Sequence, residues 1–216
     1  SSEIFSGVTD MPMSPEIYAA YVLATVILIL MPGPIVTLVI ANSLAYGTRT
    51  GVNSALGARV GNAVLAAGGA FGLAALLGLL ADVFDIIRYI GAAYLIYLGV
   101  KAWRAKPETL DDTAPMKSKK AVWGQGFIVA ITNPKTLLFY AAFFPQFIDP
   151  TMPAAPQLAL LAVTFVVIAT TLDCCYALLA GRLRNYFRDA KRAVIRNRIT
   201  GALLIGTGIG MALARR

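Results

Sequence analysis

The sequence predicts an all-α membrane protein with six transmembrane helices. Its 216 residues are 58% hydrophobic and only 14% charged, and the mean hydropathy is +0.70. A soluble domain usually carries about 25% charged residues, so this composition is typical of a chain that lies in lipid. A helix needs about 20 mostly apolar residues to cross a bilayer. Six segments approach or exceed that length: 17–41, 53–80, 86–104, 123–148, 157–180 and 199–214.

The first segment is interrupted by Met31-Pro32-Gly33-Pro34. Proline has no backbone N–H and its ring displaces a carbonyl acceptor, so two prolines around a glycine must break the helix. Inside a membrane the freed backbone groups have to face protein, water or a ligand. The half-helix that follows presents free N–H groups and the positive end of its dipole, which suit a carboxylate. We therefore expect either a ligand-free structural kink or a substrate-binding or gating site, formed by Pro32, Gly33, Pro34, Thr37 and Asn42.

A second break, Thr132-Asn133-Pro134-Lys135, interrupts the fourth segment. Lys135 lies roughly 18 Å into its span if the segment is helical. An ammonium group at that depth could attract an anionic group or neutralise a buried aspartate, whereas the simpler alternative is that the side chain extends to the interface. Asn133, Pro134 and Lys135 therefore join the predicted binding or gating site. We expect this break to meet the first one from the opposite side of the membrane.

Two charged positions lie inside other segments. Burying an ionised aspartate such as Asp173 costs on the order of 2.5–3.5 kcal/mol in a bilayer, so Asp173 should be paired or protonated, and Tyr176 shares its helix face. Arg59 and Asn62 share a face of the second segment, and Arg59 lies at a depth similar to Asp173 by residue count. We predict that Arg59 and Asp173 face each other. The four residues would serve proton coupling, bind a substrate amine, or form a structural ion pair.

Charges in the connections predict the orientation. Basic residues concentrate between segments three and four and between five and six, whereas the opposite connections carry Asp82, Asp85 and Asp149. The positive-inside rule makes the basic loops cytoplasmic, so both termini are expected outside. The predicted organisation is an N-terminal arm (1–13), a three-helix unit (14–105), a flexible cytoplasmic linker (106–122) and a second three-helix unit (123–216).

The two three-helix units look like copies of one repeat. Gly91-Ala92-Ala93-Tyr94-Leu95-Ile96 is similar to Gly201-Ala202-Leu203-Leu204-Ile205, and the breaks in segments one and four occupy corresponding positions. Because three is an odd number, the copies must have opposite orientations. This inverted-repeat plan with broken helices one and four occurs in many secondary transporters, whose sites lie near the membrane midplane.

Composition disfavours several other functions. The chain has no histidine, and its two cysteines, Cys174 and Cys175, are adjacent, so we expect no metal and no cofactor. A metal-ion exporter would have too few ligands, and an intramembrane enzyme would have only a cysteine beside Asp173 as a nucleophile and base. A non-transporting scaffold is a further alternative. The net charge of +8 fits membrane orientation and contact with anionic lipids better than nucleic-acid binding.

Glycines four residues apart also recur along the predicted helices. This spacing lets helices approach closely in lipid, so it predicts tight packing within the chain, and the same surfaces could support a homodimer. The pairs are Gly57 and Gly61, Gly68 and Gly72, and Gly206 and Gly210.

Together these motifs resemble the lysine exporter and homoserine/threonine resistance (LysE/RhtB) family of bacterial amino-acid exporters, from about Ser14 to the C-terminus. The stretches that carry the resemblance are Met31–Pro34, Asn42–Gly47, Gly51, Gly57, Gly61, Gly91–Gly99, Gly126-Phe127, Thr132–Lys135, Phe143–Phe147, Asp173, Gly181–Leu183 and Gly201.

The resemblance implies a non-enzymatic six-helix protein of the bacterial inner membrane that exports amino acids or small derivatives, driven by protons. It also implies that both breaks matter for transport. This chain departs from the family pattern at Asn62, where the family often has an acidic residue, and at Arg59, which is unusual. Asp173 is therefore the better candidate for a proton-coupling role, and we expect alternating access around the two breaks.

Overall fold

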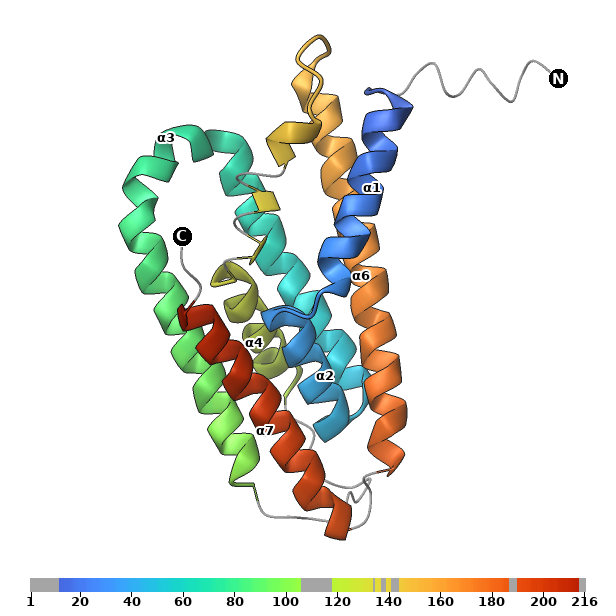
Figure 1. The fold of residues 1–216 in the computed structure, drawn as a ribbon, viewed down its shortest axis with the longest axis vertical. Helices are drawn as coiled ribbons and strands as arrows, with labels where there is room; N and C mark the ends of the chain where they lie inside the picture. The colour runs from blue at the N-terminus through green and yellow to red at the C-terminus, as the bar shows by residue number, and fades with distance from the viewer. Residues whose placement is uncertain are drawn as a thin grey trace, which may run out of the picture.

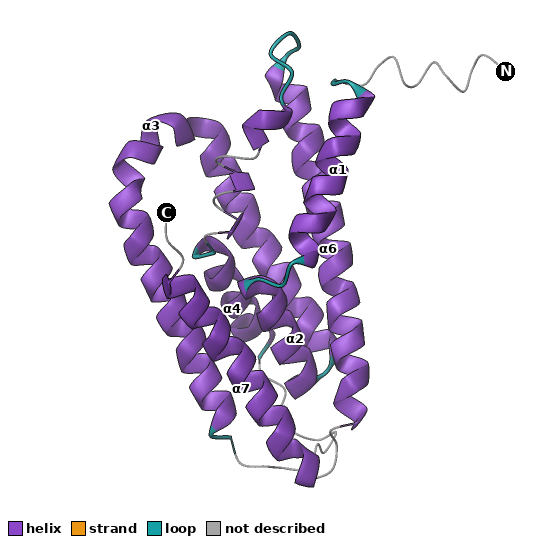
Figure 2. Cartoon of the chain, viewed as in Figure 1, coloured by secondary structure: helices purple, strands orange, loops and turns teal. Residues whose placement is uncertain are grey.

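The computed structural model describes residues 12–105, 118–133, 135, 136, 139, 140, 144–186 and 190–213, with the backbone alone described at 67–85, 87, 144, 145, 190 and 191. These residues form helices and loops without a strand (Figure 2), which confirms the all-α prediction for this part of the chain. The helices are α1 (Pro15–Leu30), α2 (Pro34–Tyr46), α3 (Thr48–Trp103), α4 (Lys119–Ile131), the 3-10 turn η3 (Phe144–Phe147), α6 (Ala154–Tyr186) and α7 (Ala190–Leu213).

Helix α3 is the largest element and differs from the sequence prediction. Two helices were expected, 53–80 and 86–104, but the backbone is helical from Thr48 to Trp103. The ribbon rises, arches and returns (Figure 1). The expected interruption is absent because residues 81–85, Ala-Asp-Val-Phe-Asp, contain neither proline nor glycine, so nothing in the local sequence ends the helix. The side chains of Asp82 and Asp85 lie outside the described residues.

Helix α4 packs against both limbs of α3. A Cβ atom at Gly57, on the rising limb, would meet the backbone of Trp123, and one at Gly91, on the returning limb, would meet the side chain of Thr132. The returning limb also packs on α7, where Gly99 and Gly201 bring the two backbones together. These close approaches confirm the predicted packing role for Gly57. Side chains would hold the backbones apart at such contacts.

The first predicted segment is broken where the sequence places the break. Helices α1 and α2 meet at a bend of 51° across Met31–Gly33 and together are long and apolar enough to cross a membrane. Helix α6 meets the same criterion alone, so two of the predicted spans have this support among the described residues. The count of six spans and the inverted repeat remain predictions.

The helix ends follow local chemistry. The side chain of Ser14 accepts a hydrogen bond from the Ile17 N–H at 3.3 Å, and Pro15 begins α1 where its missing donor is not needed. Helix α2 begins after Gly33 and ends at Tyr46, and its C-cap is Gly47, whose φ of +93° suits glycine. Because Gly47 also precedes the first residue of α3, a single residue reverses the chain there.

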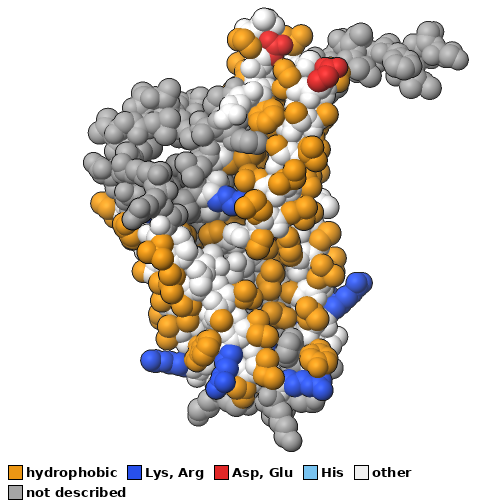
Figure 3. All heavy atoms as spheres, in the orientation of Figure 1, with side chains coloured by type: hydrophobic (Ala, Val, Ile, Leu, Met, Phe, Trp, Pro, Cys, Tyr) orange, Lys and Arg blue, Asp and Glu red, His pale blue; other side chains and the backbone are white. Residues whose placement is uncertain are grey.

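Charge is divided between the two ends of the molecule. Lys and Arg side chains gather at the lower end in Figure 3, and acidic side chains lie at the upper end. The lower end contains the α2–α3 turn and the junction of α6 with α7, and Figure 1 gives the same arrangement. This division agrees with the predicted orientation, although sidedness itself stays a prediction, as does the linker, most of which lies outside the described residues.

The glycine pair near the C-terminus has an open surface. A Cβ atom at Gly206 or Gly210 would meet nothing within 4 Å, so these glycines do not pack within the described part of the chain. Their predicted use as a homodimer surface remains a prediction. Gly68 and Gly72 fall among the residues whose side chains are not described.

Gly126 and Gly124 provide a matched test of the α3–α4 packing. A Cβ atom at Gly126 would lie 2.8 Å from the Ala58 backbone nitrogen, and closer to the Ser54 carbonyl oxygen, whereas one at Gly124 would meet nothing within 4 Å. We expect Gly126→Ala to lower the free energy of unfolding by about 1–3 kcal/mol through overpacking. Gly124→Ala should be neutral or stabilise by up to about 1 kcal/mol. The midpoint of thermal unfolding in detergent measures both; equal midpoints would contradict the packing.

Candidate functional site

The break between α1 and α2 exposes main-chain carbonyl groups that side chains from the second half of the protein satisfy. In an unbroken helix the carbonyls of Leu28 and Leu30 would accept from the N–H groups of residues 32 and 34, but both are prolines. The ammonium group of Lys135 instead donates to the oxygens of Leu28 at 2.5 Å and Met31 at 2.6 Å. The Tyr176 hydroxyl donates to the oxygen of Leu30 at 2.9 Å.

The second break positions Lys135. The Asn133 Oδ1 accepts the Lys135 backbone N–H at 3.1 Å, and its Nδ2 donates to the Thr136 Oγ1 at 2.9 Å. Asn133 is buried, so its amide fixes the turn after α4 and sends Lys135 toward α1. The prediction that the two breaks meet is confirmed by these contacts, and Pro134 itself lies outside the described residues.

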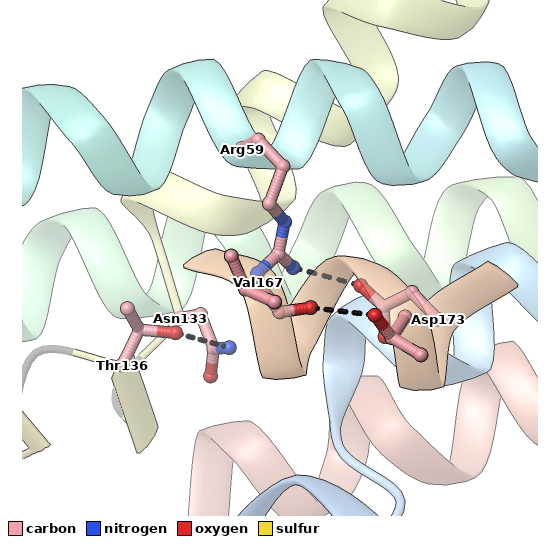
Figure 4. Close-up of polar contacts among 6 residues, drawn as sticks. Arg59, Asn133, Thr136, Val167 and Asp173 are labelled. Atoms are coloured by element: carbon pink, nitrogen blue, oxygen red, sulfur yellow. Dashed lines mark hydrogen bonds and ion pairs between the residues drawn. The ribbon is translucent and has the colours of Figure 1, made fainter. Parts of the chain in front are cut away.

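Arg59 and Asp173 form an ion pair between α3 and α6. The Arg59 Nη2 lies 2.7 Å from the Asp173 Oδ2, and the two side chains are 11% and 1% exposed. Figure 4 shows the guanidinium group of Arg59 extending from α3 toward Asp173 on α6, with Asn133 and Thr136 nearby in the same view. The predicted pairing of Arg59 with Asp173 is therefore confirmed, whereas its role in coupling stays a prediction.

One cavity joins these features, and we call it the break cavity. It measures about 50 Å³, enough for a few waters and well below the roughly 300–1,000 Å³ of ordinary ligand pockets. An amino acid could enter only if the surrounding helices moved apart. Its lining residues are Leu28, Ile29, Gly33, Ile35, Val36, Arg59, Asn62, Asn133, Lys135, Thr136, Phe139, Phe165, Ala169 and Asp173.

Two of the residues that line the break cavity hold polar atoms without partners. In the described part of the chain, neither side-chain atom of Asn62 has a hydrogen-bond partner, and the same holds for Nε and Nη1 of Arg59. Asn62 is only 1% exposed. An unsatisfied buried polar group costs about 1–3 kcal/mol, so these atoms are available to form hydrogen bonds with water or with a polar solute.

The start of α2 contributes a further polar feature to the cavity. Gly33 precedes α2 and gives it no side-chain cap, while Ile35 and Val36, the next residues with N–H groups, line the cavity. The first N–H groups of a helix have no partner within the helix. Together with the positive end of the helix dipole, they suit an anionic group.

Five of the predicted site residues that the structure describes do not line the break cavity. Pro32 and Pro34 form the break itself, and the other three contact different parts of the chain. Thr37 does not line the break cavity, because its hydroxyl pairs with that of Thr207 on α7 at 3.0 Å. Asn42 is also absent from the lining; it donates to Ser54 at 2.7 Å and Gln125 at 3.2 Å, in a polar cluster between α2, α3 and α4. Tyr176 shares a helix with Asp173, but its hydroxyl group caps α1.

The structure also adds residues that the sequence prediction missed. Thr136 is held by Asn133 at the edge of the cavity, and the rings of Phe139 and Phe165 stack with centroids 4.8 Å apart along its wall. Outside the cavity, the sequence prediction also missed Gln125, which bonds to Asn42, although a polar amide within an apolar segment is a recognisable signal. The aromatic wall had no comparable signal because phenylalanine is common in any apolar segment.

Comparison with known proteins identifies the family. Residues 26–215 match the family model described as LysE type translocator. The chain belongs to the LysE family. It is therefore a membrane protein of a transporter family, which confirms the resemblance based on its motifs. No solved structure matches the chain.

Relatives of this LysE-family chain include efflux proteins of similar length. An uncharacterized membrane protein of Vibrio cholerae is 35% identical, with 94% of this chain and 100% of the relative covered. A homoserine/homoserine lactone efflux protein of Salmonella typhimurium is 33% identical, with coverage of 94% and 99%. A leucine efflux protein of Salmonella choleraesuis is also 33% identical, with coverage of 90% and 94%.

The ion pair can be tested through its effect on stability. Removing one partner of a buried pair leaves an uncompensated charge and costs about 3–5 kcal/mol. We therefore expect Arg59→Met and Asp173→Asn each to lower the midpoint of thermal unfolding in detergent, and the double variant to lose less than the sum of the two. Arg182→Met, which alters an exposed arginine on α6, is the control. Additive losses in the double variant would contradict coupling between the two side chains.

Proposed function

We propose that this LysE-family protein exports amino acids or small amino-acid derivatives from the bacterial cytoplasm across the inner membrane. The efflux proteins for leucine and for homoserine among its relatives support this function over nearly the whole chain. The structural observation that carries the proposal is the break cavity, where a cationic side chain, a carboxylate and an open helix start line one buried space. A zwitterion requires groups of both signs.

The carboxylate of the solute binds at the start of α2 and at Arg59. The N–H groups of Ile35 and Val36 and the unpaired guanidinium atoms of Arg59 are suitable donors. The sequence led us to expect Lys135 in this role, but its ammonium group already donates to two carbonyls. Asn62 offers both a donor and an acceptor, so it can contact either end of the solute.

The ammonium group of the solute binds near Asp173 and the carbonyls that end α1. Both are negative or partly negative groups at the cavity, and the end of a helix attracts cations. The apolar lining, which includes Phe139 and Phe165, receives the solute's side chain. Asp173 also carries the coupling proton, because it is the one carboxylate among the described lining residues.

Transport proceeds by alternating access within an inverted repeat of two three-helix units. The break cavity is too small for an amino acid, so the unit that contains α1 and α2 moves relative to the unit that contains Lys135. The basic loops face the cytoplasm and both termini face outside, as the division of charge in Figure 3 supports. A homodimer and contacts with anionic lipids belong to the same proposal.

The alternatives fit less well. A metal-ion exporter would need several hard or imidazole ligands, whereas the chain has no histidine and Asp173 is the sole carboxylate among the described cavity residues. A scaffold would carry no solute, so any solute-dependent flux in proteoliposomes excludes it.

Asn62 provides a direct test of the site. In proteoliposomes preloaded with a panel of labelled amino acids, beginning with leucine and homoserine, the wild-type protein should accelerate efflux of at least one of them. We expect Asn62→Ala to lower the initial rate about tenfold, because one hydrogen bond to a charged group contributes about 1.5–3 kcal/mol. Asn185→Ala changes an exposed asparagine on α6 and should leave the rate unchanged. If the wild-type protein moved no amino acid, the proposed function would be wrong.

Proton coupling can be separated from solute binding with Asp173→Asn. This variant keeps the side-chain shape but cannot carry a proton between the two faces, so an imposed pH gradient should no longer accelerate net efflux. Exchange of solute for solute, which needs no net proton movement, should persist at saturating solute, although loss of the carboxylate weakens binding of the solute's ammonium group. The comparison requires variants matched for the amount of folded protein in the vesicles. Retained acceleration by the gradient would assign coupling to another group.

A further inference from the structure

Lys135 occupies the position in which a bound amine would be expected. Its ammonium group donates to the main-chain oxygens of Leu28 and Met31, at the negative end of α1. This is a pair of carbonyl acceptors at the end of a half-helix, which is the arrangement that a primary ammonium ion requires. The lysine stem reaches this point past Gly33, where an added Cβ atom would lie 3.3 Å from the Lys135 Cδ.

These contacts support neither of the two simpler roles for Lys135. Its ammonium group is bound at the helix break instead of extending away from it. It is also not arranged to receive a carboxylate first, since main-chain oxygens already hold it. Asn62 and Arg59 in the same cavity hold polar side-chain atoms without a hydrogen-bond partner among the described residues, and these atoms can contact the opposite end of the solute.

We propose that the ammonium group of Lys135 is a built-in substitute for the ammonium group of the exported solute, which displaces it from the oxygens of Leu28 and Met31 on binding. The inference rests on the proposed function for the identity of the solute class.

The replacement of the solute's ammonium group by that of Lys135 has a purpose in the transport cycle. An exporter must return to its inward-facing state without solute, and the two carbonyls at the end of α1 would then have neither a helical donor nor a solute amine to accept from. Lys135 satisfies them during the return. In the loaded state the solute amine does so, and the two ammonium groups exclude each other by competition for the same oxygens.

Binding of three related probes tests the competition. The probes are L-leucine, 3-methylbutylamine, which lacks the carboxylate, and 4-methylpentanoate, which lacks the amine. We expect Lys135→Met to tighten binding of leucine and of the amine about tenfold, the equivalent of one displaced charged hydrogen bond. Binding of the carboxylate should not change. Lys120→Met, which alters an exposed lysine at the start of α4, should match wild type with all three probes.

A second variant controls for the possibility that Lys135→Met fails to fold. Lys135→Gln keeps an N–H donor without the charge, so it can still cap α1, and it should also tighten binding of the amine. Net efflux should slow at least tenfold in Lys135→Met and less in Lys135→Gln, whose amide can still donate to the carbonyls during the empty return. Solute exchange, which does not require that return, should slow less than threefold in both variants. A purely structural lysine would slow both processes together.

Two outcomes would overturn the inference. One is weaker binding of the carboxylate probe by Lys135→Met, which would make Lys135 the carboxylate receptor. The other is unchanged or absent binding of the amine in folded Lys135→Met and Lys135→Gln. The proposed function fails separately, by lack of efflux from wild-type vesicles, and tighter amine binding by the variants would still support the inference in that case.

Discussion

The architecture depends on two prolines that have no backbone N–H. Pro32 and Pro34 leave the carbonyls of Leu28 and Leu30 without helical donors within an apolar chain, where unsatisfied polar groups are costly. Both carbonyls are satisfied from the second half of the sequence, one by Lys135 and the other by Tyr176. The defect in the first half thus adds hydrogen bonds between the two halves to the packing of α3 against α4 and α7. It also places the residues around the second break against the end of α1.

The ion pair between Arg59 and Asp173 is less favourable for stability than the hydrogen bonds at the break. Desolvation of both charges offsets much of their attraction, and the pair leaves two guanidinium atoms of Arg59 unsatisfied. A pair kept only for stability would have been more favourable as two apolar side chains of similar volume. Its retention beside the unpaired amide of Asn62 is consistent with a site that gives up stability to bind a polar solute.

The sequence was informative where a residue has one physical consequence. A proline without a donor breaks the helix, and a buried arginine and aspartate at equal depth must pair, so both predictions could be made without the structure. The sequence was less informative about which direction each face of a helix points. After a break, the direction of each face of α2 depends on the bend of 51°, which no residue type encodes, and Thr37 and Asn42 therefore turned away from the cavity. For α3 the hydropathy pattern was misleading, because it suggested two helices. The lack of any helix breaker at 81–85 allowed a single one.

Hydrogen-bond satisfaction separates the two groups of buried polar residues. Asn42, Ser54 and Gln125 are connected by hydrogen bonds among themselves and leave the side-chain amide of Asn42 with two partners. Such a satisfied cluster fixes the packing of α2, α3 and α4 and offers nothing to a solute. The amide of Asn62 lies at comparable burial with no partner among the described residues. Both residues are asparagines, but Asn42 comes just after the end of the first predicted segment and Asn62 lies within the second. In the structure their partners separate them: the amide of Asn42 holds helices together, whereas the amide of Asn62 has no partner among the described residues, which is why the proposed site includes Asn62 and not Asn42.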